Sequence, residues 1–249
     1  MYKITKTYLT SIADYGVINT ISLLRNKLFN FNRFRIIQDA INKKQATLYL
    51  EIGVREGAIF RNLKGKQLIK IGVDPIIHPK MKNLKKGETL FNKTSDDFFE
   101  TDAVKVFKDK RIDVAFIDGL HTFEQVIKDI FNVEKYMSKN GLIIIHDCNP
   151  FNESNENVNN QGKVRRWNGD VWKAGYYLII NRKDLKFKTL NCDNGLGMIY
   201  GFSDRHNINL DLSEVERIKK KSFSFLNKNR RKAIHLVSPF KIRAILENI

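Results

Sequence analysis

The sequence predicts an α/β protein in which a mostly parallel β-sheet is covered by helices on both faces. Five short apolar runs, each typical of a buried strand, alternate with helical patterns between residues 47 and 145. A polar residue or a glycine follows each run, as at Gly53, Asp74 and Asp118. The 249 residues, of which 42% are hydrophobic, suffice for one domain with a sizeable core.

Apolar runs and the turn residues after them place the expected strands. We expect the first five strands at residues 47–52, 68–73, 89–93, 112–117 and 142–145. Two more, at 187–190 and 198–202, flank a Cys-Asp-Asn-Gly sequence at 192–195. An Asn-Gly pair between apolar runs is typical of a hairpin, so the sheet is expected to end with an antiparallel strand.

Helical periodicity fills the gaps between these strands. We expect helices at residues 57–63, 95–108, 123–137 and 169–180. Ser95 or Asp96 is the expected cap of the second helix. A stop at Lys139-Asn140-Gly141 should end the third, with Gly141 in the left-handed conformation. The polar stretch 152–162 is expected to be a loop and a candidate lid.

Both ends of the chain predict helical extensions. We expect an N-terminal extension over residues 1–46, a sheet domain over 47–203 and a C-terminal extension over 204–249. Amphipathic stretches near 18–28 and 36–41 indicate helices in the first extension. The C-terminal extension is also helical in pattern and is rich in Lys and Arg.

The formal net charge of +17 allows two interpretations. It can reflect an anionic partner, such as nucleic acid, a membrane surface or an acidic glycan. It can equally reflect a coding sequence poor in G and C, because Lys, Asn and Ile are all abundant. No apolar run approaches the roughly 18 residues of a membrane span. With two cysteines, no metal-ligand spacing and no secretory signal, a reduced cytoplasmic protein is expected.

Residues that can carry chemistry follow the strands, at the edge where ligands of such sheets bind. The first strand leads into Glu51-Ile-Gly53-Val-Arg-Glu-Gly57, whose glycines let the backbone turn sharply and approach a ligand. This spacing matches neither the dinucleotide fingerprint nor the P-loop. Asp74 lies about 20 residues further on, where a carboxylate can accept hydrogen bonds from both ribose hydroxyls.

These motifs resemble a known family. Residues 50–57 and 72–75 resemble the first two motifs of the class I S-adenosylmethionine-dependent methyltransferases. Residues 116–124, Phe-Ile-Asp-Gly-Leu-His-Thr-Phe-Glu, resemble the fourth-strand motif of small-molecule and sugar O-methyltransferases. Residues 141–147 continue that resemblance. Arg55 departs from it, since the glycine-rich loop commonly has a glycine there.

The resemblance covers roughly residues 45–203 and implies a Rossmann-like fold with S-adenosylmethionine as cofactor. The segment 167–173 is similar to one in bacterial members often found with surface-polysaccharide genes. Asp74 would hold the ribose, and Ser95 and Asp96 would lie near the adenine.

At the methionine end of the cofactor, the resemblance implies contacts from Glu51, Gly53 and Gly57. Asp118 would face the sulfonium or a metal ion. Asp118 and Asp147 end adjacent strands, so the two carboxylates could hold Mg²⁺. A metal would lower the pKa of an acceptor hydroxyl. Asp147 could instead orient His121 without a metal.

Methyl transfer needs an aligned acceptor and a base that removes the acceptor proton. His121 is the first candidate for this base and His146 the second, because a neutral imidazole suits the task. Either histidine could instead only hydrogen-bond the chain at a strand end. Trp167, Asp170, Trp172 and Lys173 are expected on the acceptor side, although Trp172 could belong to the core.

The predicted function is methyl transfer to a hydroxyl of a sugar or other small acceptor, in surface-polysaccharide biosynthesis. A nucleic-acid methyltransferase is an alternative, but no Asn/Asp-Pro-Pro-Tyr/Phe motif follows the fourth strand. A non-catalytic cofactor-binding or interaction module, or a metal-dependent oxygenase-like reaction on the same fold, also stays open. The basic C-terminal segment predicts contact with an anionic membrane surface from the cytoplasmic side.

Overall fold

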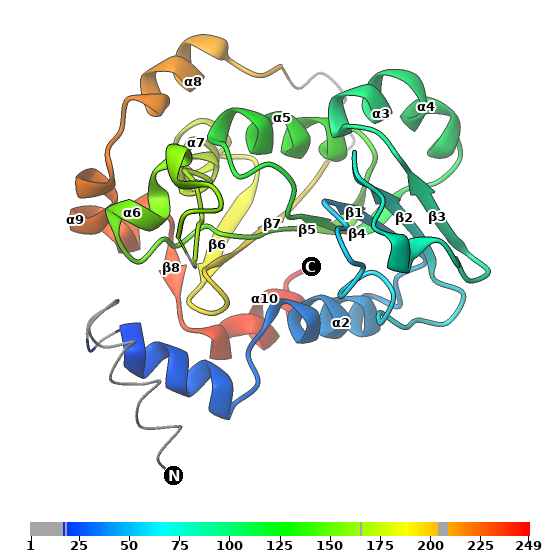
Figure 1. Cartoon of the computed structure of the whole chain (residues 1–249), viewed down its shortest axis with the longest axis horizontal. Helices are drawn as coiled ribbons and strands as arrows, with labels where there is room; N and C mark the ends of the chain where they lie inside the picture. The colour runs from blue at the N-terminus through cyan, green and yellow to red at the C-terminus, as the bar shows by residue number, and fades with distance from the viewer. Residues whose placement is uncertain (1–16, 18, 165, 204–208) are drawn as a thin grey trace.

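The structure is a computed structural model of the chain, and it describes residues 17, 19–164, 166–203 and 209–249. Within these residues the strands form one eight-stranded sheet in the order β3-β2-β1-β4-β5-β7-β6-β8. Helices cover both faces of the sheet (Figure 1). The predicted α/β fold class with a mostly parallel sheet is confirmed.

The strands confirm the predicted runs, mostly to within two residues. They are β1 (Leu48–Ile52), β2 (Ile69–Val73), β3 (Glu88–Phe91), β4 (Ile112–Ile117), β5 (Met137–Ile145), β6 (Lys186–Leu190), β7 (Leu196–Tyr200) and β8 (Leu236–Val237). Strands β1 to β5 pair in parallel, and β7 is antiparallel to both β5 and β6. The predicted antiparallel strand therefore lies between β5 and β6, not at the sheet's edge.

Helices form one layer on each face of the sheet. The α-helices with fully described bounds are α2 (Arg33–Lys44), α3 (Ser95–Thr101), α4 (Ala103–Val106), α5 (Phe123–Glu134), α6 (Glu153–Glu156), α7 (Trp172–Asn181), α8 (Leu212–Lys219), α9 (Phe223–Ala233) and α10 (Ile242–Glu247). Figure 1 shows α3, α5, α7 and α8 above the sheet and α2 and α10 below it. Short 3-10 segments occupy Pro79–Met81, Val158–Asn160 and Pro239–Lys241.

Alternation along β1 explains how the two apolar layers form. Leu48, Leu50 and Ile52 belong to the cluster packed under α5, while Tyr49 belongs to the cluster packed on α2. Successive side chains of a strand point to opposite faces, so both faces of this central strand are buried. The carboxyl end of β1 is thereby fixed beside those of β2 and β4.

The predicted helix at 57–63 is wrong, because these residues form a series of turns. The side chain of Lys70 on β2 donates to the carbonyls of Phe60 and Leu63, at 2.6 and 3.2 Å. Lys70 also pairs with Glu88 on β3 at 2.8 Å. Two helix-type bonds remain, from the N–H groups of Arg61 and Leu63. The N–H of Asn62 instead donates to the Ile59 carbonyl, and its side chain donates to the Ala58 carbonyl, so the helical ladder is interrupted.

The predicted stop after the third helix is also wrong. Helix α5 ends at Glu134, and residues 137–145 form β5. Gly141 lies inside this strand and is absent from the residues with positive φ. A side chain there would put its Cβ 2.8 Å from the carbonyl oxygen of Ser138. Crowding within an irregular strand therefore accounts for the glycine.

The predicted helix at 95–108 divides in two. Helix α3 ends with Asp102 as its C-cap, and α4 begins at the next residue. The N-cap is Thr94, one residue before the predicted cap, and its hydroxyl accepts from the backbone N–H of Asp97 at 3.1 Å.

Both extensions pack on the central domain where they are described. Helix α2 confirms the predicted helix near 36–41 and buries four apolar side chains: Ile36, Ile37, Ala40 and Ile41. Residues 1–16 and 18 lie outside the described residues. Strand β8 of the C-terminal extension pairs in parallel with β6. No helix within the described ranges is long and apolar enough to cross a membrane.

Candidate active site

Loops at the carboxyl ends of β1 to β4 enclose a cavity of about 680 Å³. This volume is typical of a small-molecule site. The cavity brings together six of the residues predicted from the sequence: Gly53, Asp74, Ser95, Asp96, Asp118 and His121. Because parallel strands end at one edge of the sheet, residues far apart in the sequence meet there.

Asp74 follows β2 and is held firmly at the cavity wall. Its Oδ2 accepts from the backbone N–H of Arg55 and its Oδ1 from that of Ile76, both at 2.8 Å. Each oxygen keeps a lone pair for a ligand hydroxyl. Arg55 has a φ of 50°, which lies in the left-handed region that favours glycine. A glycine at this position would therefore adopt the same φ without strain.

The two glycines of the first loop have different roles. Gly53 has a φ of +87°, and a Cβ there would lie 2.2 Å from the carbonyl oxygen of Asp118. Close contact between the β1 and β4 loops therefore requires glycine. Gly57 lines neither this cavity nor the smaller one beside it. Its Cβ would lie 2.0 Å from the sulfur of Met81, so packing, not cofactor contact, accounts for it.

Glu51 faces a smaller cavity of about 320 Å³, which shares Gly53 and Asp118 with the larger one. The Tyr49 hydroxyl donates to its carboxylate at 2.6 Å. Burial raises the pKa of Glu51 to about 8. A cationic group of a ligand would stabilise the ionised carboxylate here. Glu51 therefore fits the ammonium of a bound methionine moiety.

Ser95 and Asp96 begin helix α3 and line the larger cavity together with Asp74. The side-chain amide of Gln125 on α5 donates to both, at 3.1 Å to Ser95 Oγ and 3.0 Å to Asp96 Oδ1. These groups form a polar part of the cavity wall.

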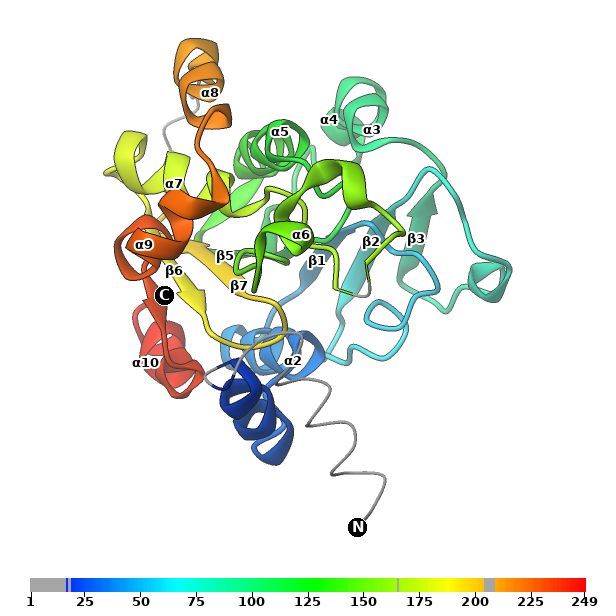
Figure 2. The same cartoon turned by 60° about the vertical axis from the view of Figure 1, so that its left-hand side comes forward.

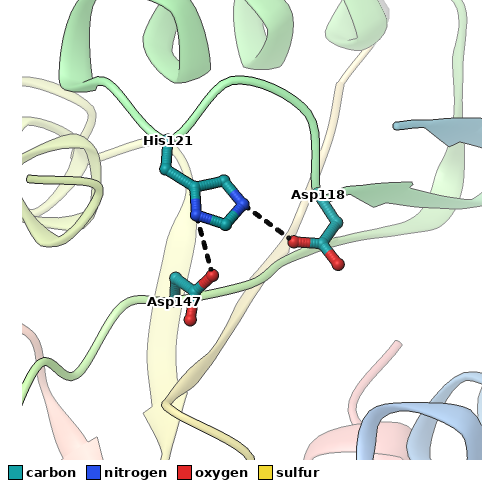
Figure 3. A group of neighbouring side chains, drawn as sticks. All are labelled: Asp118, His121 and Asp147. Atoms are coloured by element: carbon teal, nitrogen blue, oxygen red, sulfur yellow. Dashed lines mark ion pairs between the residues drawn. The ribbon is translucent and has the colours of Figure 1, made fainter. Parts of the chain in front are cut away.

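His121 lies between the two carboxylates that were predicted beside it (Figure 3). Its Nε2 is 3.2 Å from Asp118 Oδ1, and its Nδ1 is 3.2 Å from Asp147 Oδ2. Burial alone lowers the pKa of His121, but the hydrogen bond to Asp118 and both carboxylate charges outweigh it and raise the pKa. The imidazole thus has one nitrogen toward each acid and forms part of the cavity wall.

His146 lies behind this group. Its Nδ1 is 3.1 Å from Asp118 Oδ1 and 2.9 Å from Asp147 Oδ2. Burial lowers its pKa, yet the charges of Asp147 and Asp118 prevail and raise it well above the usual value. The side chain is buried and lines neither cavity. His146 can therefore position the carboxylates but has no path to an acceptor.

Sequence reasoning missed the residues that hold Asp147. Its Oδ1 accepts from the side-chain amides of Asn168, at 3.0 Å, and Asn194, at 3.1 Å. Asp147 and Asn194 have φ values of 61° and 62°, a strained conformation for non-glycine residues that is common at functional sites. Asn194 lies in the predicted hairpin turn, and this position was the only feature of the sequence that could have pointed to it.

Arg33 is the second omission, and no motif marks it. Its Nη1 donates to Asp118 Oδ2 at 2.7 Å, and its Nε to Asp193 Oδ2 at 3.1 Å. Arg33 is the first residue of α2, and Asp193 lies in the β6–β7 turn. The N-terminal extension and the hairpin therefore both contact the strand-end acids.

Trp167 covers His121. The two rings stack with centroids 4.9 Å apart and planes 17° apart. The indole N–H donates to the carbonyl of Asn157 at 2.9 Å, which ties Trp167 to the predicted lid. Gln161 and Gly162 of that segment also line the cavity. The expectation that Trp167 faces a ligand is supported.

Its three neighbours are structural. Trp172 is fully buried, and Lys173 donates to Asp170 Oδ2 at 3.0 Å and to the carbonyl of Lys219 at 2.8 Å. Asp170 Oδ1 accepts from the backbone N–H of Phe123 at 2.7 Å. The expectation that these three face an acceptor is wrong, because Trp172 is buried and donates to Glu156 of α6, while Asp170 and Lys173 bond to the first residue of α5 and the last of α8.

The acid–histidine group fits a divalent cation. One ligand atom from each of Asp118, His121 and Asp147 lies within 4.8 Å of the others. His121 Nδ1 is buried without a hydrogen bond of good geometry to any described residue. Because an imidazole joins the two acids, the set suits Mn²⁺ or Zn²⁺ at least as well as the predicted Mg²⁺.

Comparison with known proteins agrees with this geometry. Residues 50–148 match the family model described as a methyltransferase domain. An uncharacterized protein of Acanthamoeba polyphaga mimivirus is 30% identical over 175 residues, which are 64% of this chain and 74% of that protein.

Two solved structures share the fold. A Staphylococcus aureus protein assigned as a caffeoyl-CoA O-methyltransferase is 17% identical, with a TM-score of 0.52 over 79% of this chain and 98% of that one. An O-methyltransferase from Klebsiella pneumoniae, also an assignment, is 15% identical, with a TM-score of 0.53 over 68% of this chain and 80% of that one. The family match and the residues that line the cavity at the strand ends lead to one conclusion. The chain belongs to the class I S-adenosylmethionine-dependent methyltransferases.

Proposed function

We propose that the chain methylates a hydroxyl oxygen of a small acceptor, such as a sugar. The observation that carries this proposal is the position of His121, held between Asp118 and Asp147 at the wall of the cofactor cavity. The fold-sharing S. aureus and K. pneumoniae proteins, both assigned as O-methyltransferases, support the same reaction type.

Bound S-adenosylmethionine supplies an electrophilic methyl group on a sulfonium. In the proposed arrangement, Asp74 accepts hydrogen bonds from the ribose hydroxyls. Glu51 faces the ammonium group from the smaller cavity. Gly53 lets the β1 loop approach the ligand without a side chain in the way. Ser95 and Asp96 bound the adenine end.

His121 acts as the general base in this proposal. Asp147 Oδ2 lies 3.2 Å from Nδ1, and two amide donors fix Asp147 in place, so its charge favours the imidazolium that proton transfer forms. Nε2 faces Asp118 and the cavity. For the transfer, the ring would be neutral with its proton on Nδ1, and Nε2 would accept the proton of the acceptor hydroxyl in place of its contact with Asp118. The acceptor oxygen would then carry the methyl group as the carbon–sulfur bond breaks. His146, the second candidate, is a positioning residue.

Trp167 provides the acceptor surface. Its indole stacks on His121 and also lines the cavity, so an acceptor against it would lie next to the base. A flat apolar surface with convergent polar groups is typical of small-molecule sites. The sugar acceptor, the polysaccharide pathway and the cytoplasmic location stay predictions.

A divalent cation would be held by Asp118, His121 and Asp147 and would lower the pKa of the acceptor hydroxyl. His121 would then be a ligand and not the base. Dialysis against EDTA separates the two forms of the proposal. Unchanged turnover after EDTA supports His121 as base, and turnover restored by Mg²⁺, Mn²⁺ or Zn²⁺ supports a metal centre.

The test of the proposal is transfer of an isotope-labelled methyl group to a panel of sugars, phenols and ribonucleic acids. We expect label on a hydroxylated small molecule. His121→Asn should lower turnover at least about a hundredfold while the Kd for S-adenosylmethionine stays within about twofold. Label on RNA alone would favour the nucleic-acid alternative. Normal cofactor binding without any labelled product would favour a non-catalytic module.

A further inference from the structure

The outer side of the helix at residues 19–28 carries an apolar stripe exposed to solvent. Ile21, Leu24 and Leu28 are 59%, 39% and 79% exposed, and Val17, one turn earlier, is 58% exposed. Steps of three and four residues place all four on one side of a helix. Single exposed apolar residues are ordinary, but a contiguous row of them marks an interaction surface.

Two phenylalanines extend this stripe. Phe29 follows the helix and Phe240 comes from the 3-10 segment before α10; they are 46% and 52% exposed. Their ring centroids are 5.1 Å apart, and Phe31 packs against Phe240 at 4.9 Å. We call Val17, Ile21, Leu24, Leu28, Phe29 and Phe240 the apolar strip. The strip joins segments from both ends of the chain.

The inner side of the same helix is fixed beside the active site. Arg25 and Asn26 donate side-chain hydrogen bonds to the carbonyl of Asn191, at 2.6 and 3.2 Å. Asn191 begins the β6–β7 turn whose Asp193 contacts Arg33. Figure 2 shows the dark-blue helix outside α2 and next to α10. The helix that carries the strip is therefore tied to the β6–β7 turn, whose Asp193 contacts Arg33 beside the strand-end acids.

The border of the strip is positively charged. Lys27 is exposed and comes one residue before Leu28, so it lies beside the stripe on the helix surface. Lys241 and Arg243 are exposed just after Phe240. The sequence has no Asp or Glu from residue 15 to 38 or from 217 to 246, the two ranges that contain the strip.

Apolar side chains beside exposed cations match the two layers of an anionic lipid surface. Apolar groups enter the acyl boundary while Lys and Arg reach the head groups. A second copy of the chain would bring two such cationic borders together, and their like charges would repel. The charge on this face therefore favours lipid over self-association.

Within the basic C-terminal segment, several apolar side chains of α9 and α10 face the domain and not the solvent. Leu226 of α9 and Ile242 and Ile245 of α10 are buried against the domain. The segment exposes charges to a membrane but keeps these apolar side chains inside. The predicted membrane contact of this segment thus needs the apolar strip beside it.

We propose that the apolar strip and its cationic border dock the enzyme on an anionic lipid bilayer. Docking would turn the acceptor side of the active site toward the membrane. The enzyme could then meet acceptors that are carried by lipids or concentrated at the surface.

Vesicle flotation of the full chain tests this proposal. The probes are phosphatidylcholine vesicles with and without phosphatidylserine. We expect binding only when phosphatidylserine is present, and weaker binding at high salt. The triple variant Ile21→Gln, Leu24→Gln, Leu28→Gln should need more than about ten times as much lipid for half-maximal binding. Its Tm and its Kd for S-adenosylmethionine should match the wild type.

A matched control places glutamine on exposed apolar side chains elsewhere. Val104 and Leu212 are each 68% exposed, away from the strip, and the double variant Val104→Gln, Leu212→Gln should float like the wild type. The proposal is overturned if the wild type ignores phosphatidylserine, or if the triple variant binds as well as the wild type. Sedimentation that shows a dimer lost only in the triple variant, without vesicle binding, would assign the strip to a second copy.

Discussion

Arg33 Nη1 lies 2.7 Å from Asp118 Oδ2, so the first residue of α2 holds the carboxylate that ends β4. The same guanidinium reaches Asp193 in the β6–β7 turn. Burial alone raises the pKa of Asp118, yet the charges of His146 and Arg33 and the bond from His121 keep it well below its usual range. The N-terminal extension is thus part of the active site, although the methyltransferase family match begins only at residue 50.

Replacement of Arg33 tests this link. Arg33→Gln removes the charge that fixes Asp118, so we expect turnover to fall about tenfold to a hundredfold, as for other residues that orient an active-site acid. The matched control is Arg35→Gln on the same helix, whose guanidinium is half exposed and 3.7 Å from Asp39. The turnover of both variants is measured by steady-state kinetics with the acceptor that the labelled-methyl assay identifies. Equal turnover for the two variants would show that Arg33 does not contribute to catalysis.

Two glycines with nearly the same φ allow the effect of a steric clash to be measured apart from the effect of backbone strain. Gly53 and Gly87 have φ values of +87° and +86°. A Cβ at Gly53 meets Asp118 at 2.2 Å, whereas at Gly87 the nearest atom is 3.4 Å away. We expect Gly53→Ala to lose more than about 2 kcal/mol of unfolding free energy and most cofactor binding, and Gly87→Ala to lose about 1 kcal/mol. Urea unfolding and calorimetry measure both, and equal losses would contradict the loop contact.

Asp74 should determine affinity for the cofactor. Asp74→Asn keeps one carbonyl oxygen but puts an amide N–H where the carboxylate accepts from Arg55 or Ile76. We therefore expect the Kd for S-adenosylmethionine to rise at least about tenfold. Asp97→Asn, at an exposed carboxylate on α3, is the control. A Kd within about twofold of the wild type for Asp74→Asn would show that the ribose binds elsewhere.

Asp129 on α5 should make stability depend on pH. Its side chain is 1% exposed, and its Oδ2 has no hydrogen-bond partner among the described residues. Burial raises its pKa to about 7. Because the folded-state pKa is above the unfolded value of about 3.9, folding favours the protonated acid. Its contribution to stability is complete below about pH 4 and is lost as pH rises through 7.

Asp129→Asn removes this titration. We expect the variant to gain stability over the wild type between pH 5 and pH 8, by on the order of 3 kcal/mol. Urea unfolding at the two pH values measures the difference. Asp97→Asn again serves as the control, because its carboxylate is exposed. A pH-independent difference between Asp129→Asn and the wild type would show that the acid is solvated.

Sequence alone predicted the sheet and the strand-end residues well, because both depend on local patterns. An apolar run fixes a buried strand, and the residue after it must lie at the sheet's edge. Asp74, Asp118 and His121 were found in this way and line one cavity. The helix at 57–63 failed because the Asn62 side chain takes the Ala58 carbonyl that a helix would use, a contact that no periodic pattern reveals.

The supports of the site were not predictable for the same reason. Arg33 and Asn168 lie 85 and 21 residues along the chain from the acids they contact. Arg33 stands in no motif, and the 167–173 segment that contains Asn168 gave no sign that this amide holds Asp147. Gly57 was assigned to the cofactor by family resemblance, but its neighbour Met81 comes from a segment with no pattern of its own. Trp167 and Trp172 share one motif, and only burial separates their roles.

Calorimetric titration of the purified chain with S-adenosylmethionine, and separately with NAD, tests the central claim most directly. The strand-end cavity with Asp74 at its wall predicts one site per chain with a micromolar Kd for S-adenosylmethionine and no heat from NAD. Absence of binding by S-adenosylmethionine, or binding of NAD in its place, would contradict the assignment of this cavity.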